Sequence, residues 1–275
     1  LGLGMTELAL VLEEAGKALL PGPIAAAAAA ARIIAEGAGR GELIEAILSG
    51  DLVVLPALQE TAFGIDPVVA ECQAVADGDG WRLSGEKAFI PEAGGADGFL
   101  VNANGPDGLV LCHVPVDADG AHLTLSPSVD GGDTGTLSLD GTPAEPIDGV
   151  IGPGDRLCRR LLDLTLLGLG AELLGIMETA LDMAVEYLKI RTQFDQPIGA
   201  FQALQHRMAD LYSELEMTRS AVEGGLQALD SGFAVTEAAM LAKTRANDAL
   251  HLISKEGIQL HGGIGMTDEY NVGFY

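Results

Sequence analysis

Residues 191–212 read RTQFDQPIGAFQALQHRMADLY, and this stretch lies between two long helical patterns. Arg191 and Gln193 are hydrogen-bond donors beside the aromatic Phe194, and Gln202 follows at the start of the next helix. A guanidinium, amides and an aromatic face suit a phosphate joined to a planar base. A solvated loop between two helices explains the same residues, so the residue types alone leave both interpretations open.

A second stretch, QLHGGIGMTDEY at residues 259–270, follows the last helical pattern. Gly262 and Gly263 suit a helix C-terminus, where glycine takes a positive φ without strain. The same missing Cβ atoms would let a phosphate approach backbone N–H groups, with the Gln259 side chain reaching a polar edge. The pattern is not a dinucleotide-binding fingerprint of the Gly-x-Gly-x-x-Gly kind, because no strand precedes it.

Long helices are predicted on both sides of these stretches. Residues 156–190 contain no proline and keep apolar residues at three- and four-residue spacing, which predicts a helix of up to roughly 50 Å at ~1.5 Å per residue. Further helices are expected at 201–229 and 235–261, separated by a turn at 230–233. Three long helices with short connections form most of an antiparallel bundle.

The middle of the chain has a different pattern, with short apolar runs between clusters of Gly, Asp and Pro. DGDG at 77–80 and NGPDG at 104–108 predict hairpin turns. The runs cover residues 53–55, 81–83, 99–101, 109–114, 122–125 and 137–139. Strands at this spacing predict a small β-barrel or sandwich.

The first 54 residues are helical in pattern. We expect Thr6 to cap a first helix, 21–23 (Pro-Gly-Pro) to end it, and an alanine-rich helix to follow. Another short helix is expected at 41–48. The apolar side of the first helix is expected to consist of Leu8, Leu10, Val11 and Leu12. The opening of the chain has no leader pattern and resembles the interior of a longer protein.

The predicted fold is therefore α+β and multi-domain. Its parts are an incomplete N-terminal helical domain at 1–51, a middle β-domain at 52–150 and a C-terminal helical bundle at 151–275.

Charge excludes several classes of partner. The formal net charge is -25, and between residues 41 and 155 the only basic side chains are Arg82 and Lys87. Such a surface repels phosphate backbones and anionic membranes, so we expect neither nucleic acid nor a membrane as partner. The apolar stretch 161–177 contains Asp163 and Glu172, too many charges for a membrane span of that length.

The cysteines and histidines suggest neither a disulfide framework nor a metal site. Cys72, Cys112 and Cys158 are far apart, which fits three buried thiols in a reducing cytosol, so a cytoplasmic location is expected. His206, His251 and His261 have no second ligand at helical spacing.

Together, the two C-terminal stretches resemble the acyl-CoA dehydrogenase family. That family has R-x-Q-F-G-x-P-I-x-x-F-Q between the first two bundle helices and Q-x-x-G-G-x-G after the third. ALQETAFGID at 57–66 and LSGEKAFI at 83–90 are weaker matches to the family's T-E-P-x-x-G-S-D and L-x-G-x-K-x-[WF]-I-T-N motifs. The order of helices, β-domain and helical bundle also matches, so the resemblance covers essentially the whole chain.

The resemblance implies FAD as cofactor and an acyl-CoA thioester as substrate. Arg191, Gln193, Phe194 and Gln202 would contact the adenosine diphosphate half of an FAD bound mainly by a neighbouring subunit. Gln259, Gly262 and Gly263 would approach the pyrophosphate and adenine end. The implied reaction is α,β-dehydrogenation, in which a glutamate removes the α-proton, the flavin accepts the β-hydride, and the electrons pass to an electron-transfer flavoprotein.

The chain departs from the family pattern at several positions. Asp195 replaces the glycine after Phe194, and FIPEA at 89–93 replaces the W-I-T-N whose side chains pack against and hydrogen-bond the flavin ring. Where a minority of the family places the glutamate in the first bundle helix, this chain has Thr165, which is no base at neutral pH. Glu172, two turns on, is a weak alternative, and the catalytic residue stays unknown.

These departures resemble the smaller subunit of heteromeric acyl-CoA dehydrogenases. The expected assembly is either a homo-oligomer or a heterotetramer with a larger acyl-CoA dehydrogenase subunit. Three hypotheses remain: a competent homo-oligomer whose glutamate follows Tyr275, a non-catalytic subunit that completes a partner's FAD site, and a fold-related flavin-dependent monooxygenase.

Overall fold

The computed structural model describes residues 4–37, 41–61, 66, 68–147 and 154–275. By packing, the chain forms two compact units, Leu1–Pro21 with Leu166–Tyr275, and Gly22–Thr165. The first helix thus groups with the C-terminal helices, so packing does not follow the order of the chain. The three-part division 1–51, 52–150 and 151–275 stays a prediction.

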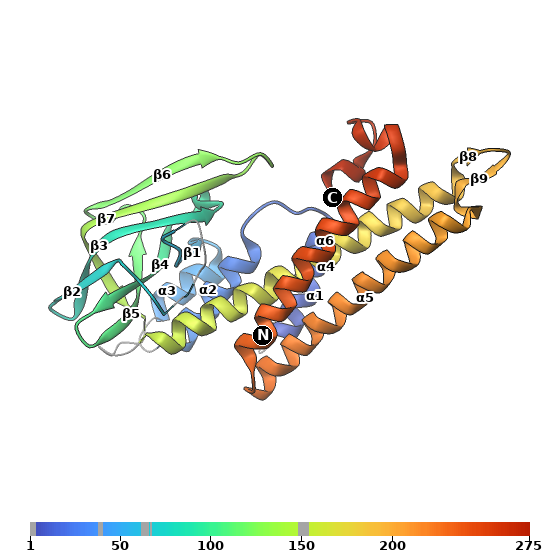
Figure 1. Cartoon of the computed structure of the whole chain (residues 1–275). Helices are drawn as coiled ribbons and strands as arrows, with labels where there is room; N and C mark the ends of the chain where they lie inside the picture. The colour runs from blue at the N-terminus through green and yellow to red at the C-terminus, as the bar shows by residue number, and fades with distance from the viewer. Residues whose placement is uncertain (1–3, 38–40, 62–65, 67, 148–153) are drawn as a thin grey trace. The chain divides into compact units, whose positions relative to one another are not determined.

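The unit Gly22–Thr165 is built around a seven-stranded sheet (Figure 1). Its strands are β1 (Val54–Ala57), β2 (Gln73–Asp77), β3 (Gly80–Pro91), β4 (Gly98–Gly105), β5 (Gly108–Pro115), β6 (Ala121–Pro127) and β7 (Asp133–Pro146). The order β4-β2-β3-β7-β5 is closed by pairing of β5 with β4, while β1 and β6 join from outside. The predicted small β-barrel is therefore confirmed.

Alternating residues of these strands fill the barrel with apolar side chains. Trp81, Leu83, Phe99, Val101 and Leu137 are among the fully buried ones. Both predicted hairpins form, because Asp77 pairs with Gly80 and Gly105 with Gly108. The sequence pattern missed β2, whose outward residues leave a single buried side chain, Ala74, as its apolar signal.

Helices α2 (Ile24–Glu36) and α3 (Gly41–Ser49) precede the barrel in the same unit. The alanine-rich α2 buries Ala25, Ala29, Ala30, Ile33 and Ile34. The small side chains of α2 leave room for other backbone close to the helix. At Gly37, directly after the helix, an added Cβ would lie 2.3 Å from the Ile147 carbonyl oxygen.

The other unit is a helical bundle of α1 (Met5–Lys17), α4 (Asp155–Ile190, from Leu166 onward), α5 (Gln202–Ser231) and α6 (Val235–His261). A short hairpin of β8 (Thr192–Gln193) and β9 (Gln196–Pro197) connects α4 to α5 (Figure 1). Short 3₁₀ segments of this unit are η2 (Ile198–Ala200), η3 (Gly262–Met266) and η4 (Asn271–Phe274), whereas η1 (Ala93–Gly95) lies between β3 and β4 of the barrel unit. The three long helices predicted for this part are confirmed.

Two predictions for α1 are wrong. The helix is capped by Gly4, whose N–H donates to the Glu7 carboxylate at 2.7 Å, and not by Thr6. Leu10 and Val11 are 62% and 60% exposed, whereas Ala9, Leu12, Ala15 and Gly16 form the buried side. The buried side contains small residues because α1 crosses α4 closely: an added Cβ would lie 2.0 Å from a carbonyl oxygen at Gly16 and 1.9 Å at Gly175.

Over the described residues, one helix, α4, is long and apolar enough to cross a membrane by length and composition. Its most apolar window is 56% buried inside the protein, which fits a core helix of a packed bundle. The three cysteines are buried, as predicted, and burial raises the pKa of Cys158 to about 12.

Candidate cofactor site

The loop between α4 and α5 is a tight β-hairpin. Thr192 pairs with Pro197 and Gln193 with Gln196, so Phe194 and Asp195 form a two-residue turn. Both have positive φ angles, 53° and 66°, which is the backbone of a type I′ turn. Asn and Gly favour that turn, whereas an aromatic residue adopts it only with strain. The family's usual glycine at 195 therefore has a conformational basis.

The hairpin is held at its base, and its tip stays exposed. The Ile198 N–H donates to the Arg191 carbonyl at 2.8 Å, and the Gln205 side chain donates to the Gly199 carbonyl at 2.8 Å. The Phe194 ring contacts Phe201 edge-on at 6.0 Å between centroids, yet Phe194 remains 86% exposed. The loop thus presents an aromatic ring that the chain itself does not cover.

The end of α6 is an open backbone turn. Gly262 caps the helix at φ 65° and ψ -138°, a conformation that is essentially restricted to glycine. Added Cβ atoms on Gly262 and Gly263 would meet nothing within 4 Å, so space lies directly over both residues. Bare backbone of this kind can be approached closely by a phosphate.

A cavity of about 410 Å³ brings the two stretches together. Five of the seven residues predicted to bind the cofactor line it: Arg191, Gln193, Gln259, Gly262 and Gly263. Phe194 and Gln202 do not. Phe194 lies at the hairpin tip and Gln202 is exposed at the start of α5.

The cavity is free of acidic residues in a strongly acidic chain. Its remaining lining residues, all within the described part of the chain, are Tyr187, Ile198, Leu260, His261 and Ile264. Arg191 is therefore the charged group of the lining. A guanidinium, two amides and uncovered backbone form a donor set that fits the pyrophosphate of FAD.

An aromatic stack beside this cavity was not predicted from the sequence. The His261 ring lies 4.6 Å from Tyr187 and 4.6 Å from Tyr270, between centroids. His261 Nδ1 is 2.7 Å from the Gly257 carbonyl oxygen, while the buried Nε2 has no hydrogen-bond partner among the described residues. The stack joins α4 to the end of α6. Tyr187 lies one turn before Arg191, and His261 directly precedes Gly262. These positions next to predicted site residues were the signal from which the stack could have been predicted.

The other unit contains the segment that matches the family's flavin-ring motif. Phe89 is 48% exposed and has φ 56°, again a positive value for an aromatic residue. It follows Lys87, whose ammonium group pairs with Glu60 at 2.5 Å. Glu60 and Lys87 come from the two weaker family motifs, and the structure brings them into contact.

Neither candidate base gains support from its surroundings. The Thr165 hydroxyl donates to the Leu161 carbonyl at 2.8 Å, one turn back in α4. Burial raises the pKa of Glu172, whose backbone lies where α1 crosses α4 at Gly16. This crossing explains the partial burial of Glu172 without a catalytic role.

Comparison with known proteins agrees with this geometry. Residues 153–275 match the family model "Acyl-CoA dehydrogenase, C-terminal domain". Acyl-CoA dehydrogenase IpdE2 of Mycolicibacterium smegmatis is 30% identical over 272 residues, which are 98% of this chain and 71% of that protein. The short-chain specific acyl-CoA dehydrogenase of Homo sapiens is 33% identical over 80% of this chain, and the chain spans only 56% of the length of that protein.

Two solved structures have the same fold over nearly the whole chain. A variant of the Tcur3481-Tcur3483 steroid ACAD superposes with a TM-score of 0.90 at 36% identity, covering 99% of this chain and 74% of that one. The ChsE4-ChsE5 complex from Mycobacterium tuberculosis gives 0.88 at 27% identity, covering 99% and 74%. The shared fold and the sequence identity over most of the IpdE2 length establish the family: this chain belongs to the acyl-CoA dehydrogenases.

Proposed function

We propose that this protein is a subunit of an FAD-dependent acyl-CoA dehydrogenase, which carries out α,β-dehydrogenation of an acyl-CoA thioester. The observation that carries the proposal is the acid-free cavity in which Arg191, Gln193, Gln259, Gly262 and Gly263 meet. A bound FAD would supply the hydride acceptor. An electron-transfer flavoprotein would then accept the electrons.

In this proposal each of these five residues has a binding role. The Arg191 guanidinium offers a charge-assisted, two-pronged contact to a phosphate, and Gln193 and Gln259 offer amides to the remaining polar edges. The bare backbone at Gly262 and Gly263 allows a phosphate to approach its N–H groups. All five residues are exposed to solvent, which supports enclosure of the cofactor by a neighbouring subunit.

The hypothesis that we favour is that of a subunit completing a partner's cofactor site. The cavity and the hairpin keep the donors that serve a cofactor, whereas the Thr165 hydroxyl is bound to its own helix backbone. Two of the most similar solved structures carry paired names, Tcur3481-Tcur3483 and ChsE4-ChsE5. These observations support a heterotetramer with a larger acyl-CoA dehydrogenase subunit.

A competent homo-oligomer is the second candidate, and Phe89 is the observation that favours it. The chain keeps an exposed aromatic side chain where the family packs one against the flavin ring. In that case each chain would hold a ring of its own, and the flavin content would be one per chain instead of one per pair.

The test of the proposal is FAD retention by an Arg191→Ala variant. Loss of a charge-assisted hydrogen bond costs about 1.5–3 kcal/mol, so retention by the assembled oligomer should fall roughly tenfold or more. The variant should fold normally, since Arg191 is exposed and not part of the core. Retention is measured as bound flavin after gel filtration at graded dilution.

Arg159→Ala is the matched control, because Arg159 is an exposed arginine on the same helix and not a lining residue of the cavity. It should retain FAD as the wild type does. Equal retention by Arg191→Ala and wild type would show that the cofactor does not bind in this cavity.

A further inference from the structure

Three rings, those of Tyr187, His261 and Tyr270, pack against one another beside the Arg191 cavity, and we call them the ring cluster. The centroid of the His261 ring is 4.6 Å from that of each tyrosine, and the two tyrosine rings meet edge-on at 5.9 Å. His261 is only 3% exposed, and both tyrosines are half-buried. Aromatic pairs at such distances attract one another beyond the gain from burial alone.

Burial of His261 leaves one of its ring nitrogens without a partner. Nδ1 lies 2.7 Å from the Gly257 carbonyl oxygen, so Nδ1 carries the proton and donates it. Nε2 is then an acceptor, and it is buried with no hydrogen-bond partner among the described residues. An unsatisfied buried acceptor destabilises a folded protein. Stability alone would therefore favour a ring without polar atoms at this position.

The ring cluster is directly attached to both parts of the cavity. The Arg191 N–H donates to the Tyr187 carbonyl at 2.9 Å, so this tyrosine and the arginine share one turn at the end of α4. His261 directly precedes Gly262, where the bare backbone begins. Tyr187 and His261 line the cavity, whereas Tyr270 does not. Contacts among the three rings thus connect the guanidinium end of the cavity to its glycine end.

Tyr270 is itself held in place, because the chain after α6 folds back over the helix end. An added Cβ at Gly265 would lie 2.7 Å from the Ile258 carbonyl oxygen, so η3 passes close to the last turn of α6. Further along, the Tyr275 hydroxyl donates to the Lys17 carbonyl at 2.8 Å, at the end of α1. Tyr270 lies between these two anchored points and can support His261 from the side away from the cavity lining.

We propose that His261 is a positioning residue, which ties the end of α4 to the end of α6 through the ring cluster. The tie fixes the spacing between the Arg191 guanidinium and the backbone at Gly262. The ligand that this spacing suits, the diphosphate of FAD, rests on the proposed function. The tie itself does not, because it follows from contacts within the helical-bundle unit.

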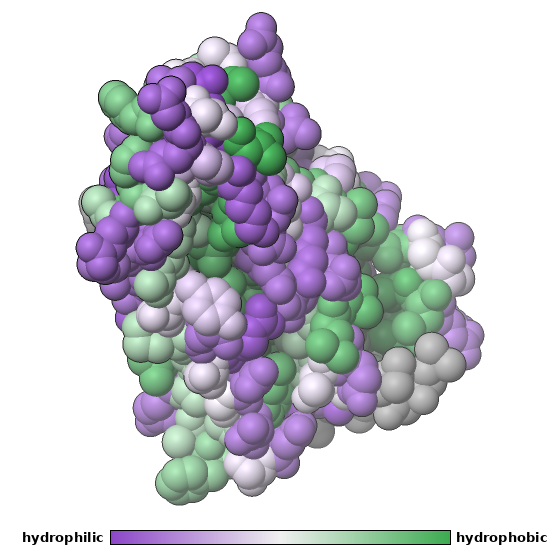
Figure 2. All heavy atoms as spheres, turned by 90° about the vertical axis from the view of Figure 1, so that its right-hand side faces the viewer, coloured by the Kyte–Doolittle hydropathy of each residue, from purple (hydrophilic) through white to green (hydrophobic). Residues whose placement is uncertain are grey.

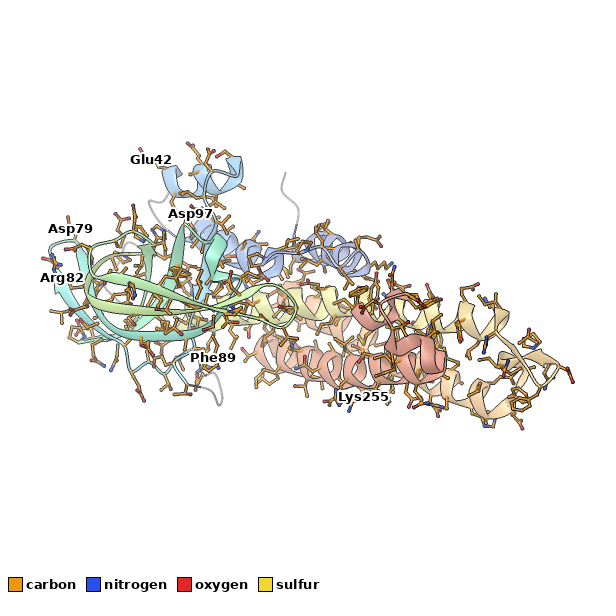
Figure 3. The ribbon with its side chains drawn as sticks, turned by 90° about the horizontal axis from the view of Figure 1, so that it is seen from above. Glu42, Asp79, Arg82, Phe89, Asp97 and Lys255 are labelled. Carbon is orange, nitrogen blue, oxygen red and sulfur yellow. The ribbon has the colours of Figure 1, made fainter. Side chains whose placement is uncertain are left out.

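Two variants test the tie. His261→Phe keeps a ring but removes both the bond to Gly257 and the unsatisfied nitrogen. Tyr270→Leu removes a ring that is not part of the cavity lining, so its effect on the cavity passes through the other two rings. His251→Ala is the matched control, because His251 is an exposed histidine of the same helix, one turn before Lys255 at the surface of α6 (Figure 3).

The first readout needs no cofactor. The Gly262 N–H donates to the Ile258 and Gln259 carbonyls, so hydrogen exchange of amides 257–262 reports on the last turn of α6. Measured by mass spectrometry on the flavin-free chain, exchange should be roughly tenfold faster or more in Tyr270→Leu, less accelerated in His261→Phe, and unchanged in His251→Ala. Unchanged exchange in both ring-cluster variants would overturn the tie.

The second readout is FAD retention by the assembled oligomer, compared with the free energy of unfolding of each variant. His261→Phe should be no less stable than the wild type, because it lacks the unsatisfied acceptor, yet its FAD retention should fall roughly threefold or more. Tyr270→Leu should lose roughly tenfold or more. A merely structural role would lower stability and retention together in His261→Phe. If Tyr270→Leu does not fold, His261→Phe decides.

Combination of His261→Phe with Arg191→Ala shows whether the tie acts through the guanidinium. The joint loss of FAD retention should be smaller than the product of the two single losses, because an absent guanidinium cannot be misplaced. Losses that multiply, or wild-type retention in both ring-cluster variants, would overturn the positioning role. If Arg191→Ala retains FAD as the wild type does, the diphosphate is overturned as the ligand together with the proposed function, and hydrogen exchange still decides the tie.

Discussion

Phe194 and Asp195 have strained backbone conformations at the tip of the β8–β9 hairpin. Their φ angles of 53° and 66° are those that Asn and Gly adopt most easily. Phe194 is 86% exposed, so little burial within the chain offsets the strain. A strained, uncovered aromatic residue of this kind does not stabilise the isolated chain, and its exposed ring is open to contact with a ligand or partner.

The double substitution Phe194→Asn/Asp195→Gly should therefore stabilise the isolated chain and weaken the assembled site. We expect the free energy of unfolding to rise by about 1 kcal/mol, because both central positions of the turn then hold preferred residues. Chemical denaturation of the wild type and variant measures the change. FAD retention by the oligomer should fall at the same time.

Phe194→Ala separates the two effects, since it removes the ring but leaves a non-glycine residue at a positive φ. It should lose FAD retention without any gain in stability. A double variant that is less stable than the wild type would show that the turn is not strained.

For single residues, the sequence indicated candidate hydrogen-bond donors better than the contacts that these residues make. Arg191, Gln193, Gln259, Gly262 and Gly263 were singled out by their motifs and by the family resemblance, and the structure places all five on one cavity, while their contact with the cofactor stays a prediction. Contacts between distant parts of the chain could not be predicted. The stacking of His261 on Tyr187 depends on how α4 and α6 pack, and the pairing of Lys87 with Glu60 depends on the barrel.

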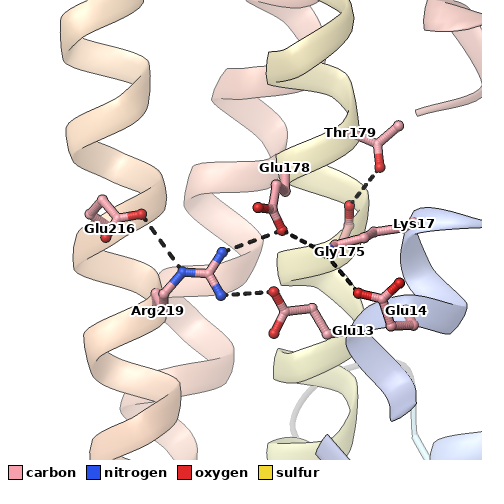
Figure 4. Close-up of polar contacts among 8 residues, drawn as sticks. All are labelled: Glu13, Glu14, Lys17, Gly175, Glu178, Thr179, Glu216 and Arg219. Atoms are coloured by element: carbon pink, nitrogen blue, oxygen red, sulfur yellow. Dashed lines mark hydrogen bonds and ion pairs between the residues drawn. The ribbon is translucent and has the colours of Figure 1, made fainter. Parts of the chain in front are cut away.

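Helix α1 is joined to the bundle by a network of charges (Figure 4). Arg219 on α5 contacts Glu13 at 2.7 Å and Glu178 at 3.5 Å, and Lys17 contacts Glu178 at 3.0 Å. Arg219 is 25% exposed and Glu13 is 16% exposed, so water screens this network less than it screens a surface pair. The planar guanidinium connects three helices, which a lysine could not do with the same geometry.

Arg219→Ala should destabilise the chain by about 1–3 kcal/mol at pH 7, because it leaves partly buried carboxylates without their partner. Lys189→Ala is the control: Lys189 and Glu186 are 63% and 65% exposed, and loss of such a pair costs about 0–0.5 kcal/mol. Chemical denaturation measures both. Equal stability of wild type and Arg219→Ala would mean that helix packing alone holds α1.

The same network makes the stability difference between the wild type and Arg219→Ala depend on pH. Burial raises the pKa of Glu178, but the hydrogen bond and charge of Lys17 and the charge of Arg219 outweigh it, so the pKa lies below its usual value. A carboxylate with a lowered folded-state pKa stabilises the fold above its unfolded pKa and loses that contribution as the pH falls. The gap between wild type and Arg219→Ala should therefore narrow between about pH 5 and pH 3. The pKa of Lys17, raised to about 12 mainly by its hydrogen bond to Glu14, has no effect in that interval.

Elements with a strong local signal were predicted, and those defined by pairing were not. The long helices and both tight hairpins follow from apolar spacing and turn residues. Strand β2 has one buried side chain, Ala74, and exists because β3 pairs along its whole length. The buried side of α1 was misassigned because it contains small residues, among them Gly16 where α1 meets α4, whereas large apolar residues were expected.

Over the whole molecule, charge and exposed apolar surface point toward assembly. The chain carries a net charge of -25, yet large apolar side chains on α5 and α6 are exposed, among them Tyr212, Met217, Met240 and Leu241. Figure 2 shows hydrophobic residues interspersed with hydrophilic ones on one face of the molecule. Self-association brings like charges together, so a partner with a less acidic surface is favoured over a second copy.

We expect that the 275-residue chain, produced alone, does not dehydrogenate acyl-CoA and that activity requires a larger acyl-CoA dehydrogenase subunit. The position of the alternative base is occupied by Thr165, whose hydroxyl is bound to the Leu161 carbonyl and is not acidic enough to exchange protons near pH 7. The FIPEA segment also lacks the Thr and Asn of the family motif, and misplacement of reacting groups by about 1 Å can cost on the order of 10²-fold in rate.

A ferrocenium-coupled assay on the lone chain, and then on the chain with the partner subunit, tests this expectation. Light scattering on the same samples establishes which assembly is present, so that a lack of turnover is not confused with a lack of pairing. The chain mixed with the partner subunit should oxidise acyl-CoA, and the flavin content of this complex should be one per pair of chains. Turnover of the lone chain at ordinary enzymatic rates, ~1–10³ per second, would instead support the competent homo-oligomer. The Arg191 cavity would then serve a second copy of the same chain, with the base supplied from elsewhere in the protein.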